Sequence, residues 1–201
     1  PDGRIPPLTP EGEELAASAA TAARAYATNP SAGPEDTTPY VRCITRGLPS
    51  MMMPIGYNNG LQIVQGPGYV AITKEMIHET RVIPTEPQAE AGDDLRLWLG
   101  VPQGRWNGDT LEVTTTNFNG RASYRGSSAD MTLTERYTLL GPELLEYQFT
   151  IDDPKVWTAP WTGMFRFSRD AEDGQYELVE YACHEGNYGM EGILTGSRAR
   201  E

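Results

Sequence analysis

The chain has 201 residues, more than a minimal domain needs and within the range of a single barrel or sandwich. Asp and Glu outnumber Lys and Arg by 28 to 16, which gives a formal charge of -12, and no basic run is long enough to neutralise a phosphate backbone. Nucleic acid and anionic membrane surfaces are therefore not expected as partners. No stretch approaches the roughly 20 consecutive apolar residues of a spanning helix, which also argues against a membrane partner.

The first predicted element is a helix that begins after Thr9 and runs to about Ala27. Thr9, Pro10 and Glu11 supply a capping hydroxyl, a proline at the first helical position and an acid in the first turn. We expect this helix to pack against the main body. The sequence opens at Pro1 without an initiator methionine or a signal-like apolar region, so we also expect the chain to be a trimmed form.

Residues 31–59 are rich in Pro, Gly and Thr and are expected to wrap around the body as an ordered segment. Cys43 lies in this segment and Cys183 lies near the end of the chain. One such pair fits either a disulfide in an oxidising compartment or two buried thiols in a reducing one, and we favour the disulfide. Neither cysteine has the C-x-x-C partner of a structural zinc site.

Beyond Leu61 the apolar pattern changes to a period of two, which is typical of half-buried strands. Asn107-Gly108 predicts a hairpin with a type I′ turn. The predicted strands are Leu61 to Gln65, Tyr69 to Thr73, Glu75 to Ile83, Leu111 to Phe118, Thr132 to Leu139, Leu144 to Ile151, Met164 to Ser168 and Tyr176 to Cys183.

These strands predict an all-β fold, an antiparallel meander of about eight or nine strands closed into a calycin-like barrel, with one N-terminal packing helix. The alternative is a two-sheet β-sandwich. Residues 1–60 would form the helix and the wrapping segment, and residues 61–201 the β core, within one structural domain.

The two histidines are the first candidates for chemistry, because a pKa near neutrality suits proton transfer. Strand alternation from Glu75 onward places His78 on the less charged face, which we expect to be the interior, and Arg81 on the opposite face. His78 fits either a general acid or base or a core histidine bonded to a backbone carbonyl.

His184 is the stronger candidate, since it stands where a predicted strand enters a glycine-rich loop. Glu180 lies on the same strand face as His184, and Glu185 follows it directly. Glu75, Glu180 or Glu185 would orient one of the two imidazoles.

Substrate contacts are expected from Tyr57, Asn58 and Arg81, although the Asn-Asn-Gly sequence at 58–60 is also ordinary turn sequence. Further candidates for substrate binding are Asn187, Tyr188 and Trp106. No metal ligands are assigned, because His78-Glu79 lacks the second histidine of an H-E-x-x-H motif.

Four blocks carry a resemblance to a known family: residues 1–12, 75–78, 104–111 and 183–190. In these blocks the chain resembles uncharacterised, predicted exported proteins from environmental bacteria, and the resemblance extends over nearly the whole chain. It implies export to the periplasm or the medium and supports the disulfide. It assigns no activity and no catalytic residue.

The leading functional hypothesis is an exported β-barrel enzyme that acts on a small organic molecule, a sugar derivative or a plant aromatic. The histidines and a carboxylate would perform acid-base chemistry of the lyase, isomerase or hydratase type, for which no cofactor is needed. The alternative is a non-catalytic small-ligand-binding barrel. Oligomeric state is not predicted.

Overall fold

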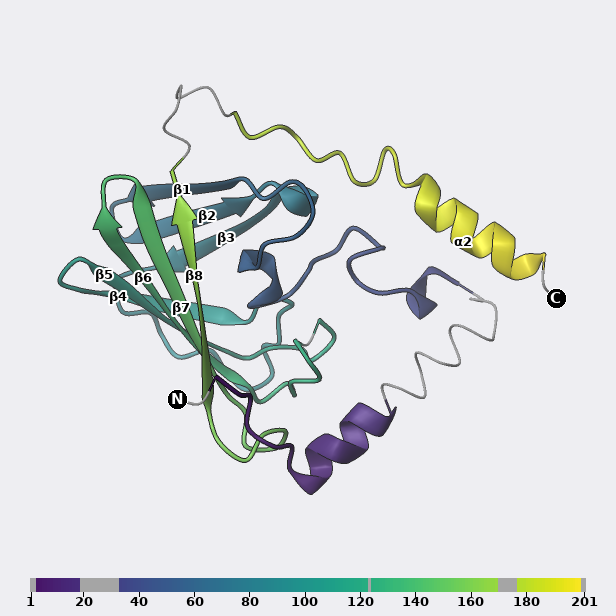
Figure 1. Ribbon diagram of the computed structural model, residues 1–201, viewed down its shortest axis with the longest axis horizontal. Helices are drawn as coiled ribbons and strands as arrows, with labels where there is room; N and C mark the ends of the chain where they lie inside the picture. The colour runs from purple at the N-terminus through teal and green to yellow at the C-terminus, as the bar shows by residue number, and fades with distance from the viewer. Residues whose placement is uncertain (1–2, 19–32, 123, 170–176, 200–201) are drawn as a thin grey trace.

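A computed structural model describes residues 3–18, 33–122, 124–169 and 177–199. The chain is mostly β, as predicted, and its strands form two antiparallel sheets (Figure 1). The three-stranded sheet contains, in order, β1 (Leu61–Gly66), β2 (Tyr69–Lys74) and β3 (Glu79–Pro84). The five-stranded sheet contains β4 (Val101–Asn107), β5 (Thr110–Thr116), β6 (Thr132–Gly141), β7 (Leu144–Asp152) and β8 (Trp161–Ser168).

Besides the N-terminal helix, the described residues form three short 3-10 helices and one α-helix. They are η1 (Pro34–Asp36), η2 (Ser50–Met52), η3 (Met76–His78) and α2 (Tyr188–Arg198). Among the described residues, no helix combines the length and the apolar character needed to cross a membrane.

The N-terminal helix begins where predicted. Residues 10–18 are helical, and the Thr9 hydroxyl accepts a hydrogen bond from the Gly12 amide at 3.0 Å. The helix packs through its first turn, where Gly12 is buried against the Val156 backbone and the Thr9 amide donates to the Val156 carbonyl at 2.9 Å. The predicted continuation from residue 19 to Ala27 lies outside the described residues.

The predicted hairpin between β4 and β5 is confirmed, but its turn is one residue further along. Asn107 pairs with Thr110, which leaves Gly108 and Asp109 as the two turn residues. Only Gly108 has a positive φ, 57°, a pattern that fits a type II′ turn rather than the type I′ turn predicted.

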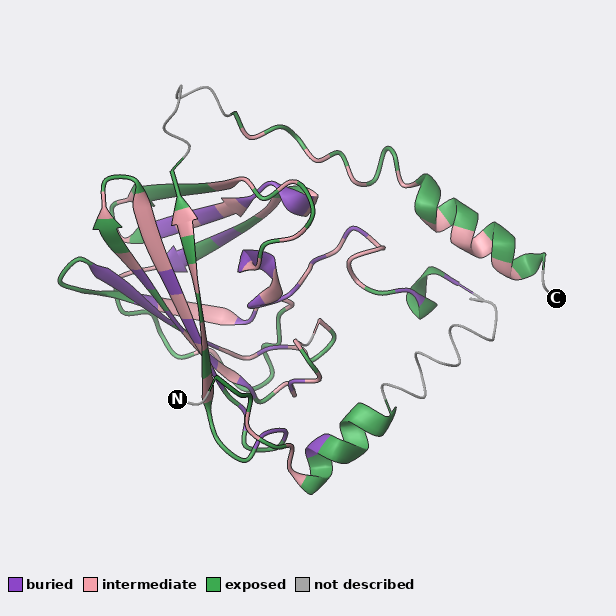
Figure 2. Cartoon of the chain, viewed as in Figure 1, coloured by how far each residue is buried: buried purple, intermediate pink, exposed green. Residues whose placement is uncertain are grey.

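The core lies between the two sheets (Figure 2). Ile72 and Ile83 of the smaller sheet pack in one cluster with residues of the larger sheet, among them Leu133, Phe149 and Ile151. The sheets approach each other most closely at β3 and β4, where a side chain on Gly104 would come within 2.8 Å of Ile83. Within the described residues the strand pairings nevertheless remain two separate sets.

The prediction of one strand from Glu75 to Ile83 was wrong in its first half. The chain reverses there through η3, where Ile77 and His78 both have positive φ angles of 63° and 54°. The side chain of Glu75 bonds to the preceding loop instead of standing on a sheet face, so β3 starts only at Glu79.

The predicted interior face of this segment was also wrong. Arg81 and Ile83 are buried, whereas His78, Thr80 and Val82 are exposed. The charged face turned inward because Arg81 has a buried carboxylate partner on the other sheet, described below.

The predicted strand from Tyr176 to Cys183 was wrong as well. Residues 177–182 contain no strand, and they lead through a turn into α2. The helix stands where the sequence predicted a glycine-rich loop. Asn187 starts α2 by accepting a hydrogen bond from the Met190 amide at 3.1 Å. We call residues 177–198 the C-terminal strap; it contains no buried residue (Figure 2).

Candidate functional site

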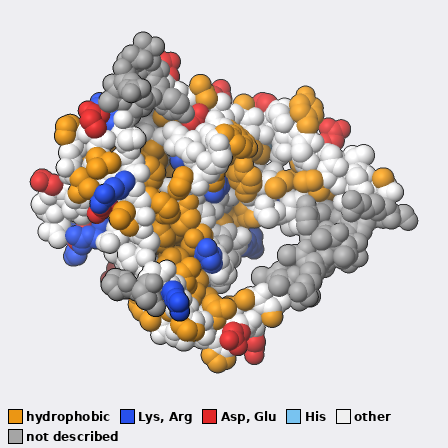
Figure 3. Space-filling model, viewed as in Figure 1, with side chains coloured by type: hydrophobic (Ala, Val, Ile, Leu, Met, Phe, Trp, Pro, Cys, Tyr) orange, Lys and Arg blue, Asp and Glu red, His pale blue; other side chains and the backbone are white. Residues whose placement is uncertain are grey.

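A large cleft of about 1920 Å³ opens between the smaller sheet and one end of the larger sheet, where β6 ends, β7 begins and β8 ends. Its walls are about equally apolar and polar, and in Figure 3 hydrophobic side chains gather in a band down the middle of the viewed face. The apolar side chains that line it include Ile63, Val70, Ile72, Leu111, Leu145 and Phe167. Small-molecule sites usually enclose about 300 to 1,000 Å³, so the cleft has ample room for a small organic molecule, including an elongated one.

A buried ionic network lies in the interior next to this cleft. Arg81 donates to Glu135 through Nη1 at 2.9 Å, its Nη2 lies 2.6 Å from the second carboxylate oxygen, and it also bonds to Thr115. The hydroxyls of Tyr137 and Tyr147 donate to the same Glu135 oxygen at 2.9 and 3.0 Å. Of these five residues only Tyr137 lines the cleft.

Burial and the charge of Glu135 raise the pKa of both tyrosines well above 10. Burial opposes the charged form of Arg81, but the Glu135 carboxylate outweighs that effect and raises the pKa of the guanidinium. The Arg81 guanidinium therefore stays charged and both phenols stay protonated at neutral pH. The network is a fixed polar structure in the core, because every charge in it has a partner.

His78 and Trp106 are the candidate site residues that line the cleft. His78 is exposed, and its amide donates to the Glu75 carbonyl at 2.9 Å. Trp106 is 47% exposed and stands near the end of β4. Arg81 was expected to hold substrate oxygens, but the structure commits its guanidinium to Glu135 and Thr115.

Glu75 and Asn58 are brought together just behind the cleft wall. Asn58 donates to one Glu75 oxygen at 2.9 Å, and the Gly60 amide donates to the other at 3.0 Å. Since Glu75 is only 2% exposed, its carboxylate serves to hold the loop before β1 against the end of β2.

Lys74 lies beside this loop and was not identified from the sequence. Its side chain is 1% exposed, and its ammonium group donates to the Asn59 carbonyl at 2.6 Å. Burial, followed by repulsion from Arg46, lowers the pKa of Lys74 to about 8, although Glu75 opposes the shift. Asn59 itself lines the cleft, so the lysine is separated from the cleft by this loop.

Tyr57 belongs to a group of three tyrosines rather than to the cleft. Hydrogen bonding with Tyr40, and then with Tyr181, lowers the pKa of Tyr57, while burial is only a small opposing effect. The same contacts connect the wrapping segment, the loop before β1 and the strap.

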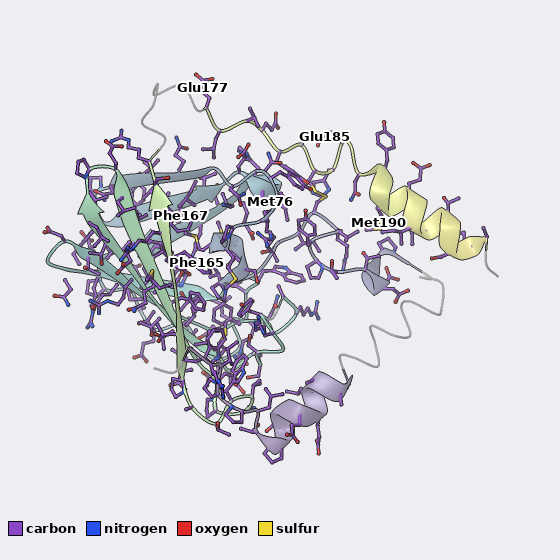
Figure 4. The ribbon with its side chains drawn as sticks, viewed as in Figure 1. Met76, Phe165, Phe167, Glu177, Glu185 and Met190 are labelled. Carbon is purple, nitrogen blue, oxygen red and sulfur yellow. A yellow bond between two sulfur atoms is a disulfide. The ribbon has the colours of Figure 1, made fainter. Side chains whose placement is uncertain are left out.

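The remaining candidates lie on the strap and do not line the cleft. His184, Glu180 and Glu185 are exposed, and Tyr188 is 77% exposed. Asn187 has a structural position, since it caps α2 and also donates to the Val41 carbonyl at 2.9 Å. In Figure 4, Glu185 and the α2 residue Met190 lie well away from Phe165 and Phe167 on β8.

The predicted disulfide is present. Cys43 and Cys183 are bonded, with their Cα atoms 5.8 Å apart and a sequence separation of 140 positions. The bond ties the strap to the wrapping segment, not to a last strand as the sequence suggested.

No group of three or more His, Cys, Asp or Glu side chains stands in a metal-binding arrangement in the part of the chain that the structure describes. No protein-family model, curated protein or solved structure matches this chain.

Removing the disulfide is expected to release the strap while the two sheets stay folded. Apart from the disulfide, the strap is held mainly by Asn187, by the tyrosine contacts and by a long contact from Thr37 to the Met190 sulfur at 3.9 Å. Cys183→Ser should therefore accelerate chymotrypsin cleavage near Tyr181 by about tenfold or more. Mass spectrometry of the products would locate the cuts, and Cys43→Ser should behave alike; unchanged cleavage in both variants would contradict this expectation.

Proposed function

We propose that this protein binds a small, largely apolar organic molecule in the cleft between its two sheets. The observation that carries the proposal is the combination of a volume of about 1920 Å³ with aliphatic and aromatic side chains that form about half of the walls. Soluble proteins rarely leave such a surface open unless it binds something. Polar groups at the cleft, including His78 and Ser168, would orient the ligand.

A neighbouring pair of leucines on β6 provides a direct test. Leu139 and Leu140 are both largely exposed, at 58% and 49%, but only Leu139 lines the cleft. N-phenyl-1-naphthylamine, a neutral fluorescent probe, should bind saturably with a micromolar dissociation constant. Leu139→Asn should weaken that binding about fivefold through the loss of apolar contact, whereas Leu140→Asn should leave it unchanged.

Trp106 allows the location of the probe to be checked independently. Because this indole lines the cleft, excitation of tryptophan should transfer energy to the bound probe, and Trp106→Phe should reduce that transfer. Absence of saturable binding, or equal weakening by the two leucine variants, would refute the proposed function.

A second candidate function is acid-base catalysis of the lyase or isomerase type on the bound molecule. It is favoured by one observation, the exposed imidazole of His78 at the cleft. His184 would have no part in it, since it does not line the cleft. With a turned-over ligand in hand, His78→Asn should abolish activity while probe binding is retained; undiminished activity would eliminate this candidate.

We also propose that the protein is exported and that its two sheets form a partly open barrel. The disulfide supports export, because disulfides persist in oxidising compartments, and so does the resemblance to predicted exported proteins. The barrel is supported by the order of the strands. Within each sheet every strand pairs with its neighbour in sequence, and β3 of one sheet lies beside β4 of the other. A sandwich is the alternative arrangement.

A further inference from the structure

Among the described residues, the carboxylates that line the cleft form no ion pair, unlike most of those on the five-stranded sheet. On the sheet surface, Glu112 is paired with Arg105 and Arg136, and Glu146 is paired with Arg166. Three acids line the cleft, namely Asp109, Glu143 and Glu177, and none of them forms an ion pair with a described residue.

These three acids come from different parts of the sequence but from one end of the sheet. Asp109 is in the β4–β5 turn, Glu143 is in the β6–β7 turn, and Glu177 starts the strap (Figure 4). Of the described residues, Arg169 is the one arginine or lysine that lines the cleft, and its amide donates to the Glu143 carbonyl at 2.8 Å. Three carboxylates and one guanidinium among the described lining residues give this part of the cleft an excess of negative charge.

The charge of the whole chain acts in the same direction. A formal charge of -12 attracts cations toward the molecule and repels anions, and a cleft with low-dielectric walls concentrates such a field. It also disfavours a second copy of the chain as the occupant, since two strongly acidic surfaces would have to meet.

We propose that the ligand of this cleft is a cationic amphiphile, an apolar body that carries a protonated amine. The inference rests on the proposed function, because the apolar walls would bind the body of the molecule. The amine would lie at this end of the cleft, close to one of Asp109, Glu143 and Glu177 and in the field of all three, whereas a carboxylate in the same place would be repelled. The contacts are solvent-exposed, so the preference for amine over acid is about tenfold at low ionic strength and decreases with added salt.

Three twelve-carbon compounds with the same tail test this preference. Dodecylamine, dodecanol and dodecanoate are each titrated against the bound N-phenyl-1-naphthylamine, below the concentrations at which they form micelles. The amine should displace the probe at the lowest concentration and the acid at the highest. Raising the NaCl concentration to 0.5 M should reduce the differences between the three displacing concentrations.

Single charge substitutions separate the effect of the carboxylates at the cleft from the effect of the net charge of the chain. The measured quantity is the concentration of dodecanoate that displaces the probe divided by that of dodecylamine. Glu143→Gln should reduce this ratio about twofold to threefold, and Arg169→Gln should increase it. Glu90→Gln is the matched control. Glu90 is exposed and does not line the cleft, and its substitution removes the same charge from the chain. An equal effect of Glu90→Gln would assign the preference to net charge and overturn the proposed site.

Failure of this inference is distinguishable from failure of the proposed function. If the neutral probe binds and dodecanoate displaces it as well as dodecylamine does, the cleft binds ligands but not cationic ones, and the inference is wrong. If the probe does not bind at all, the proposed function fails first. Probe affinity that falls as the protein concentration rises would identify a second copy as the occupant and would also overturn the inference.

Discussion

Replacing Arg81 with methionine is expected to lower the free energy of unfolding by about 3 to 5 kcal/mol, because it leaves the Glu135 carboxylate buried without its cation. Arg81 and Glu135 are 3% and 0% exposed, so water does not screen the charge that remains. The hydroxyls of Tyr137 and Tyr147 still donate to Glu135 but do not neutralise it. Urea unfolding at pH 7 measures the loss.

A surface ion pair is the matched control for this variant. Arg166 pairs with Glu146 at 3.1 Å, but its side chain is 55% exposed. Arg166→Met should therefore cost at most about 1 kcal/mol. The double variant Arg81→Met, Glu135→Leu should recover part of the loss, since it removes both charges. A loss below about 1 kcal/mol for Arg81→Met alone would mean that Glu135 is not an isolated buried charge.

The second large expected effect has the opposite sign. Lys74→Met should raise the free energy of unfolding by about 2 to 3 kcal/mol at pH 6.5, because it removes a buried ammonium group that forms no ion pair with any described carboxylate. The loss of the hydrogen bond to the Asn59 carbonyl subtracts a part of this gain.

The pH dependence identifies the cause. The pKa of Lys74 is about 8 in the folded chain, below its ordinary 10.5, so under pH 8 the amine is protonated in both states and the cost of burying its charge is complete. Between pH 8 and 10.5 the unfolded chain binds more protons, and the stability of the unmodified protein rises. The gain from Lys74→Met should thus fall to about 1 kcal/mol at pH 9.5.

Lys155 provides the control, since it is the only other lysine in the chain and is 50% exposed beside Asp130. Lys155→Met should produce no comparable stabilisation at either pH. A gain from Lys74→Met that stays constant between pH 6.5 and 9.5 would show that side-chain packing, not charge, causes it.

Much of the sheet structure was predictable, because its signals are local. Strand β7, from Leu144 to Asp152, shows the period of two, and so does β6 before it. The Asn107-Gly108-Asp109 sequence predicted a hairpin, and Thr9 predicted the start of a helix. In each case the residues that cause the structure are adjacent in the chain.

The candidate site was less predictable, because burial of its polar residues depends on distant partners. Arg81 was expected on an outer face, and it is buried because Glu135 lies 54 residues away in sequence but beside it in space. Leu133, Glu135 and Tyr137 follow one another at every second position on the inner face of β6. Two polar residues at positions where the pattern predicts apolar ones were the available signal of a buried network. Lys74 offered a similar signal, since it shares the inner face of β2 with Val70 and Ile72.

The two histidines illustrate the same limit. Both were expected near strand faces, but His78 lies in a 3-10 turn and His184 in an exposed turn of the strap. Only His78 lines the cleft, although His184 was the preferred candidate.

The sequence by itself determined the β-rich class, most hairpins, the capped N-terminal helix and the pair of cysteines available for a disulfide. These follow from backbone preferences, side-chain periodicity and covalent chemistry, which act over a few residues or need only a count. The tertiary structure alone decided which charges are buried, which residues face the cleft and where the strap is tied. Those outcomes depend on contacts between sheets and segments far apart in the chain, and the free energy of burying a charge is set by the partner that it meets there.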